Sequence, residues 1–350
     1  MVEVRELAVP GAAKPGRGGV HPQGGPGVMA RVCRGVLGVG LLMGAFPGLH
    51  PLAQATPQVG ARTTTAHAKS QPNHPAASKP APAANLAEPC KQWVPRLPGL
   101  SAAQCSALKL QTSGIRSVQG RELWMGDVGA RNSRVKVLVL GAIHGDELSA
   151  TTVALQWMGL AQDNGAEALW RFVPMLNPDG VMVQPARRVN AHGVDLNRNF
   201  PTPGWAQEAP RYWAQRTRKD PRRWPGHTPL SEPESRFLHQ QMDQFQPQLV
   251  VSIHAPYGVL DFDGPHDPPL RLGRLRMDKL GVFPGSLGHY GGVQQNMPVV
   301  TIELEHALDM PRESEMQAMW NDLLRWMDTR LYRPSPVEAA KIKANRPLAP

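Results

Sequence analysis

Residues 135–143 read VKVLVLGAI, and residues 144–147, directly after them, read HGDE. A continuous apolar run of strand length that is rich in β-branched residues is typical of a strand buried on both faces of a sheet. The residues that follow, 148–160, favour a helix. A buried strand that leads into a helix is the repeating unit of α/β proteins with a parallel sheet.

Further segments continue this alternation. Strands are also expected at residues 169–176, 248–254 and 298–304. Ser231 and Glu234 have the spacing of a capping box and predict a helix to about residue 245, and another helix is expected over 313–331. Residues 201–230 show no clear element and are expected to form a functional or flexible loop. The sequence therefore predicts a single α/β domain with a mixed, largely parallel sheet flanked by helices.

The positive charge of the chain lies mostly outside this domain. The 350 residues hold 38 Lys and Arg against 28 Asp and Glu, a formal charge of +10. Residues 1–88 account for +5 and residues 334–350 for +2, which leaves +3 for residues 89–333. A strongly basic chain favours a nucleic-acid partner, but no aromatic and basic stripe or recognition motif is present. We therefore expect no nucleic-acid partner.

Residues 1–55 have the features of a secretory leader. Two arginines precede the apolar run VLGVGLLMGAF at 36–46, and the small-x-small tripeptide at 53–55 has the form of a cleavage site. The run is shorter than the about 20 residues that cross a bilayer. We expect cleavage, export to the periplasm and no stable membrane insertion afterwards. An uncleaved membrane anchor is the alternative, and Met29 is an alternative start of the chain.

Composition divides the rest of the chain. Residues 56–88, rich in Pro and Ala without apolar periodicity, predict a disordered linker, and residues 334–350 predict a flexible tail. The catalytic domain is expected over residues 89–333. The domain retains Cys90 and Cys105, and an even pair in an exported protein favours a disulfide, with two free buried cysteines as the alternative.

Polar side chains follow the predicted strands where each one ends. His144 and Glu147 follow the first strand, His254 ends the strand at 248–254, and Glu303 ends the last one. In open α/β sheets, the functional site lies beyond the carboxyl ends of the strands. Two imidazoles and one carboxylate are the ligand set of a catalytic zinc ion with one open position, and a further carboxylate can transfer protons. Each residue alone is a weak signal, but chance does not readily place all of them at strand ends.

The motifs HGDE, NPDG, RRVN, GVDLNRNF, SIHAP and TIEL, in this order, resemble those of the zinc carboxypeptidase family over roughly residues 135–330. Within the family, the chain is most similar to the bacterial murein peptide amidases, which cleave the amide between γ-D-glutamate and diaminopimelate. The loop GSLGHYGG at 285–292 is a weaker sign of that subgroup.

The resemblance implies a role for each matching residue. His144, Glu147 and His254 would hold one zinc ion per chain. Arg188 would polarise the scissile carbonyl, and Glu303 would be the general acid and base. Glu305, two residues further along, is the alternative to Glu303, which the position of TIEL favours.

The same resemblance implies the substrate contacts. Asn197 and Arg198 would hold the terminal carboxylate of the substrate, and Asp195 would orient a ligand histidine. Arg187 is adjacent to Arg188, so the two arginines can exchange roles. For the tyrosine that covers the substrate in this family, Tyr290 is the first candidate and Tyr257 the second.

These observations together predict an exported zinc peptidase or amidase. It would hydrolyse an amide next to a free carboxylate in a small peptide, with a murein peptide as the expected substrate. A related N-acyl amino acid deacylase, of the succinylglutamate desuccinylase and aspartoacylase type, is the first alternative, although such enzymes are usually cytosolic and lack the full motif set. A non-catalytic cell-wall binding module is the second, and its expected sign, loss of a zinc ligand or of the glutamate, is absent. The oligomeric state stays open.

Overall fold

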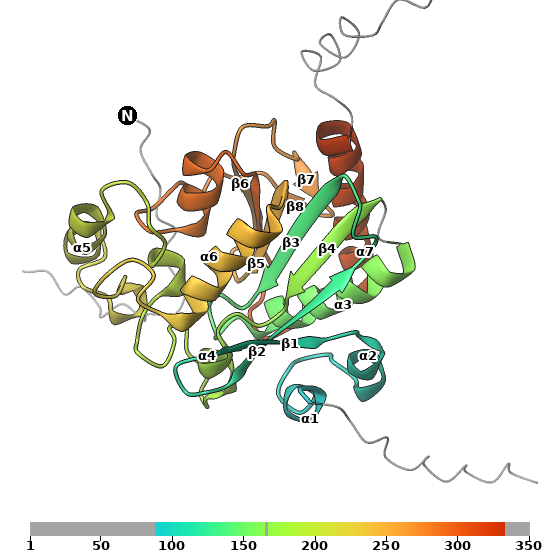
Figure 1. Cartoon of the computed structure of the whole chain (residues 1–350), viewed down its shortest axis with the longest axis horizontal. Coiled ribbons are helices and arrows are strands. Elements are labelled where there is room, and N and C mark those ends of the chain that lie inside the picture. Colours follow the sequence, from blue (N-terminus) through green and yellow to red (C-terminus); the bar gives the residue numbers. More distant parts are fainter. Residues whose placement is uncertain (1–87, 165–166, 333–350) are drawn as a thin grey trace, which may run out of the picture. The chain divides into compact units, whose positions relative to one another are not determined.

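A seven-stranded mixed sheet is the centre of the computed structural model, which describes residues 88–164 and 167–332 (Figure 1). In sheet order the strands are β1 (Gln111–Arg116), β2 (Glu122–Val128), β4 (Ala168–Val173), β3 (Val135–Gly141), β5 (Leu249–His254), β9 (Val299–Glu303) and β6 (Val259–Asp263). The four strands β4, β3, β5 and β9 are parallel, and β1, β2 and β6 are antiparallel to their neighbours. The expected α/β fold with a mixed sheet flanked by helices is confirmed.

The buried parallel strands are the ones that their apolar runs predict. Every residue of β5 is buried, and in β3 only Lys136 reaches solvent in part. Strands at the centre of a sheet with helices on both faces need apolar side chains in both directions, which explains the lack of alternation in their sequences. All four end at the same edge of the sheet, so the residues that follow them meet there.

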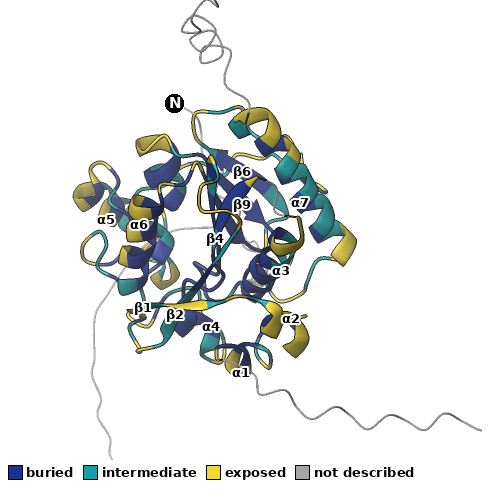
Figure 2. Cartoon of the chain, turned by 45° about the vertical axis from the view of Figure 1, so that its right-hand side comes forward, coloured by how far each residue is buried: buried dark blue, intermediate teal, exposed yellow. Residues whose placement is uncertain are grey.

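Helices cover both faces of the sheet. On one face, α3 (Leu148–Asn164) and α7 (Glu313–Met327) pack on side chains such as Val139 and Ile302. On the other face, α6 (Pro233–Phe245) packs on Leu140 and Val250. Figure 2 shows this arrangement as buried strands inside helices whose outer sides are exposed. Alternate residues of each strand therefore belong to two separate cores.

Short elements complete the described chain. They are α1 (Cys90–Trp93), α2 (Ala102–Ala107), α4 (Pro178–Met182), η1 (Leu196–Arg198), α5 (Trp205–Gln215), η2 (Pro221–Arg223), β7 (Arg271–Leu272), β8 (Leu275–Arg276), η3 (Gly288–Gln294) and η4 (Asp328–Tyr332). A disulfide joins Cys90 to Cys105, so the expected pairing is confirmed. Both cysteines are buried in a small core against Leu155 of α3.

Two expectations about local structure are wrong. The predicted capping box of α6 does not form, because Glu232 is the N-cap residue and the Ser231 hydroxyl donates to the Glu232 carboxylate. The stretch 201–230, expected to be a loop, contains α5 and η2. Helix α5 buries Trp205 and Ala209, one turn apart, and this short apolar stripe is obscured in the sequence by Pro and Arg.

The expected leader, all but the last residue of the expected linker, and the expected tail lie outside the described residues. Those three assignments stay predictions. In the part of the chain that the structure describes, no helix has the length and apolar character needed to cross a membrane.

Candidate metal centre and active site

Three buried side chains converge at the carboxyl edge of the sheet. His144 follows β3, Glu147 immediately precedes α3, and His254 is the last residue of β5. The Nδ1 atom of His144 lies 2.8 Å from Oε1 of Glu147, and Nδ1 of His254 lies 3.1 Å from Oε2 of the same carboxylate. The two Nδ1 atoms are 3.1 Å apart, and the three ligand atoms lie within 4.8 Å of one another. The three candidate ligands are thus brought together.

The backbone explains why these side chains meet. Strands β3 and β5 are parallel neighbours in which Gly141 pairs with Ile253, so the two strands end side by side at the same edge of the sheet. The chain then turns at Gly145, where a Cβ atom would lie 2.3 Å from the carbonyl carbon of Gly180. Only glycine fits at that distance, so Gly145 allows His144 and Glu147 to face the same point.

The donor set fits a zinc ion. Each histidine directs Nδ1 toward Glu147 and has a polar group behind Nε2: Ser252 Oγ at 2.9 Å for His254, and Asp195 Oδ1 at 3.3 Å for His144. Metal-binding histidines usually have such a partner on the second ring nitrogen, which fixes the tautomer and the ring. Two nitrogens and a carboxylate are ordinary ligands of catalytic zinc. Burial opposes ionisation of Glu147, but the two histidines outweigh it and lower the pKa of that carboxyl.

Arg188 lies beside this cluster and Arg187 does not. Arg188 donates from Nε and Nη2 to Oδ2 of Asp195 at 3.1 and 3.0 Å, and its Nη1 lies 3.9 Å from Oε1 of Glu147. The Arg188 carbonyl accepts from the side-chain amide of Asn177 and from the N–H of Gly145. These bonds fix the backbone, so that Arg188 faces the cluster and the neighbouring Arg187 is exposed.

Asn197 and Arg198 lie on η1, next to Asp195. The Asn197 side-chain oxygen accepts from the N–H of Leu287 at 2.8 Å. Arg198 is buried, its guanidinium lies 4.6 Å from the centre of the Phe283 ring, and its Nε atom has no hydrogen-bond partner among the described residues. Burial lowers the pKa of Arg198. A buried guanidinium with an unused donor has capacity for an anionic ligand.

Glu303 ends β9 directly beside His254, its partner in the parallel register. The carboxyl is buried, the N–H of Tyr257 donates to it, and within the part of the chain that the structure describes its Oε2 has no hydrogen-bond partner. Burial, together with the charge of Glu147, raises the pKa of Glu303 well above its usual range. Glu305 lies beyond the end of the strand and pairs with Arg274. The geometry therefore favours Glu303 over Glu305 as the proton-transfer group.

Several known proteins have similar sequences. The sequence profile of the zinc carboxypeptidases matches residues 99–262. Murein peptide amidase A of Escherichia coli strain K12 is 33% identical over 215 residues, which cover 58% of this chain and 85% of that protein. The chain belongs to the zinc carboxypeptidase family. It is therefore a hydrolase, as the motifs predict.

Two further relatives extend the comparison. Murein peptide amidase A of Vibrio campbellii is 31% identical over 191 residues, which cover 49% of this chain and 70% of that protein. The crystal structure of thrombin activatable fibrinolysis inhibitor is 17% identical, with a TM-score of 0.50, and the match covers 62% of this chain and 67% of that one. The second match shows only that the two chains have a similar fold.

The structure does not bring Tyr290 to the cluster. Its ring is buried in η3, where it stacks on Phe200 at 5.8 Å between ring centres and lies 5.3 Å from the ring of His239. A tyrosine held in the core in this way cannot cover a substrate without leaving its packing. Tyr257, the second candidate, is joined to Glu303 through its backbone N–H.

Two residues near the site were not singled out from the sequence. Asn177 accepts from the N–H of Gly180 and donates to the Arg188 carbonyl, which holds the Arg188 backbone in place. Ser252 bonds to His254. A usable signal existed for Ser252, because residues two apart on a strand point to the same face.

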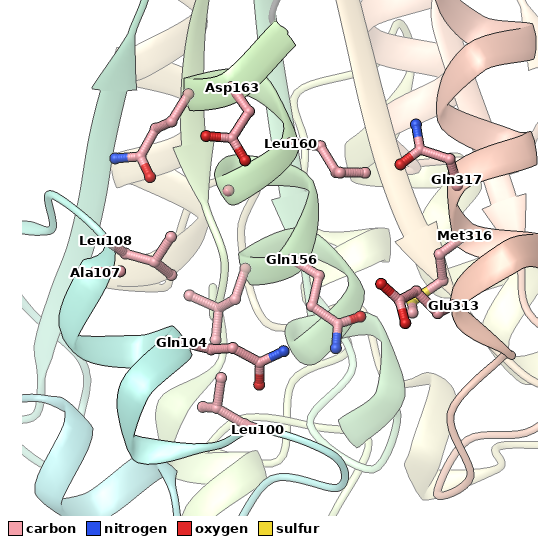
Figure 3. A pocket seen from close by; sticks show the side chains of 13 residues that line it. Leu100, Gln104, Ala107, Leu108, Gln156, Leu160, Asp163, Glu313, Met316 and Gln317 are labelled. Atoms are coloured by element: carbon pink, nitrogen blue, oxygen red, sulfur yellow. The ribbon is translucent and has the colours of Figure 1, made fainter.

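A cavity on another part of the molecule has different chemistry. It has a volume of about 400 Å³ and lies between α3, α7 and the segment around α2 (Figure 3). Its lining is mainly leucines and glutamines with two acids, Asp163 and Glu313, and the described residues that line it include no histidine and no basic residue. It shares no lining residue with the candidate metal centre. A lining with two acids and no basic residue does not suit an anionic substrate, so this cavity is not expected to bind the substrate of the candidate metal centre.

Strand β6, next to Glu303 in the sheet, carries two acids on one face. Asp261 and Asp263 pair across to Thr301 and Val299 of β9. Burial and the charge of Asp261 raise the pKa of Asp263 to about 7, against the opposing charge of Lys279. The folded protein therefore binds a proton at Asp263 that the unfolded chain has already lost above about pH 4.

This proton predicts a pH-dependent stability. Between about pH 4 and about pH 7, the folded state holds a proton on Asp263 that the unfolded state has released. The free energy of unfolding therefore falls as the pH rises through this range. The variant Asp263→Asn is neutral at all pH values. It should stabilise the protein by on the order of 2 kcal/mol near pH 8, a value discounted for partial exposure, and by much less near pH 5. Thermal unfolding at both pH values measures this. The same gain at both, or an equal gain in the exposed control Asp309→Asn, would contradict the prediction.

Proposed function

We propose that the protein is a zinc-dependent amidase that hydrolyses an amide next to a free carboxylate in a small peptide. Its substrate in this proposal is a murein peptide, cut between γ-D-glutamate and diaminopimelate. The observation that carries the proposal is the convergence of His144, Glu147 and His254 next to the buried carboxyl of Glu303. The 33% identity to murein peptide amidase A supports the choice of substrate.

The three ligands would hold the metal, and other residues of the chain carry the remaining steps. When bound, zinc would supply a Lewis acid that polarises a carbonyl and lowers the pKa of water to about 7. Glu303 takes a proton from the attacking water at its free Oε2 atom as the new C–O bond forms. It returns the proton to the leaving nitrogen as the C–N bond breaks, which yields one carboxylic acid and one amine. The raised pKa of Glu303 suits a group that must both accept and donate.

Arg188 and the η1 residues hold the substrate in this proposal. Nη1 of Arg188 is not used by Asp195 and points toward the cluster, where it can donate to the oxygen of the scissile carbonyl as negative charge develops. Asn197 and Arg198 bind the carboxylate on the amine side of the bond, for which the buried Nε of Arg198 is an available donor.

The proposal includes export to the periplasm. The basic residues, the apolar run at 36–46 and the cleavage-site tripeptide at 53–55 support it. Murein is built outside the cytoplasmic membrane, so an enzyme that cuts murein peptides in place must be exported.

The test uses the purified protein and the tripeptide L-Ala-γ-D-Glu-meso-diaminopimelate. Mass spectrometry should detect L-Ala-D-Glu and free diaminopimelate, a chelator should abolish both products, and added zinc should restore them. The absence of any chelator-sensitive product would refute the murein substrate. Faster hydrolysis of N-acetyl or N-succinyl amino acids than of the tripeptide would instead favour a deacylase.

A further inference from the structure

A second cavity, with a volume of about 440 Å³, opens directly beside the catalytic arginine. Arg188 itself is part of its lining. The other side chains that define its chemistry are two arginines and two tryptophans: Arg187, Arg222, Trp213 and Trp224. Neither Asn197 nor Arg198, which are assigned to the carboxylate on the amine side, takes part. The cavity is thus a separate space that adjoins the position of the scissile carbonyl.

Of the two additional arginines, one is paired with an acid and the other is not. Arg222 pairs with Asp146 at 2.8 Å, within the turn that carries His144 and Glu147. Arg187 is exposed, and within the described residues its side chain has no ion pair and no hydrogen bond. Of the two additional arginines, Arg187 is therefore the one that remains available to a ligand.

The tryptophans form fixed walls. The indole N–H of Trp213 donates to the carbonyl of Asp220 at 2.7 Å, and the ring of Trp224 meets the ring of His227 edge to face at 4.9 Å. Both rings lie partly exposed in the cavity. Aromatic walls around a guanidinium exclude water from one side of it, which strengthens its bond to an anion.

The position of the cavity identifies which part of the substrate enters it. The carbonyl that Arg188 polarises belongs to the acyl side of the amide, so the acyl residue lies next to Arg188. In an ordinary peptide that residue continues as another amide. In a γ-linked glutamate the scissile bond uses the side-chain carboxyl, and the α-carboxylate stays free a short aliphatic chain away.

We propose that this cavity binds the free α-carboxylate of a γ-linked glutamyl residue through Arg187, with Trp213 and Trp224 against its aliphatic chain. The inference rests on the proposed amidase function and adds to it a basis for choosing γ-linked over α-linked peptides. The planar fork of a guanidinium matches a carboxylate with two parallel hydrogen bonds. The substrate would then be held by one carboxylate on each side of the bond.

Two substrates test the assignment. One is L-Ala-γ-D-Glu-meso-diaminopimelate, and the other is the same peptide with D-isoglutamine, in which an amide replaces the α-carboxylate with little change in shape. The wild-type protein should prefer the carboxylate form by about 10- to 100-fold in kcat/KM, the range expected for a charge-assisted hydrogen bond. In Arg187→Gln this ratio should approach one, because kcat/KM for the carboxylate substrate falls. The fall should come mainly from a higher KM, since Arg187 does not touch the reacting atoms.

The control variant is Arg131→Gln, since Arg131 is also exposed but does not line the cavity. It should keep the wild-type ratio between the two substrates. Equal cleavage of both substrates by the wild-type protein, or an unchanged preference in Arg187→Gln, would overturn the assignment of Arg187. Cleavage of neither substrate would overturn the amidase proposal itself.

Discussion

Glu303→Gln is expected to lower kcat by about 10³-fold while the protein keeps one zinc ion per chain. Glutamine has nearly the same shape as glutamate but cannot take up a proton from water and pass it on, and general acid and base catalysis contributes about 10²- to 10⁴-fold. The folded structure should tolerate the change. The side-chain oxygen of glutamine can still accept from the N–H of Tyr257, and Oε2 of Glu303 has no hydrogen-bond partner to lose in the described chain.

The measurement combines single-turnover hydrolysis with the zinc content of the same sample. Glu305→Gln is the matched control, because Glu305 is partly exposed, lies past the end of β9 and pairs with Arg274. It should retain activity within about threefold of wild type, since loss of an exposed pair has a small effect. If Glu305→Gln loses the activity and Glu303→Gln keeps it, the assignment of the proton-transfer group is wrong.

The central strands could be predicted from the sequence, and the outer ones could not. Strands β3, β5 and β9 are buried on both faces, so their burial requires continuous apolar runs that are visible in the sequence. Strand β1, with the sequence QTSGIR, is mostly exposed and exists as a strand because β2 pairs with it. Edge strands formed by pairing leave a weak sequence pattern.

Some residues of the site could likewise be predicted from the sequence and others could not. His144, His254 and Glu303 were predictable because each one stands at the end of an identifiable strand. Arg188 was preferred to Arg187 only through the family resemblance. The strand pattern does not separate the two arginines, because the direction of their side chains depends on the bonds that Asn177 and Gly145 make to the Arg188 carbonyl. The position of Tyr290 also depends on contacts between distant segments, because its ring stacks on that of Phe200.

Asp195→Asn should impair both zinc binding by His144 and the orientation of Arg188. Asp195 is fully buried, receives two hydrogen bonds from Arg188 and lies 3.3 Å from Nε2 of His144. Burial opposes its ionisation, but Arg188 and His144 hold the pKa of Asp195 well below its usual range. The carboxylate charge is therefore part of the native site, and a neutral amide removes it from both neighbours.

Three separate losses are expected from this change. Zinc affinity should fall by about 10- to 100-fold, because the partner of a ligand histidine is lost. At saturating zinc, kcat/KM should remain about 10²-fold below wild type, because Arg188 loses the carboxylate that orients it toward the carbonyl. The free energy of unfolding should fall by about 3 kcal/mol, since Arg188 is left as a largely buried charge with a weaker partner.

Ser252→Ala separates these effects. Ser252 bonds to Nε2 of His254, and among the described residues it makes no hydrogen bond to Arg188, so its loss should weaken zinc binding alone. Zinc titrations of both variants, followed by hydrolysis and chemical unfolding, distinguish the two results: excess zinc should restore most of the activity of Ser252→Ala and little of that of Asp195→Asn. Full recovery of Asp195→Asn with zinc would show that Asp195 acts only through His144. Arg188 would then be oriented by its backbone bonds to Asn177 and Gly145 alone.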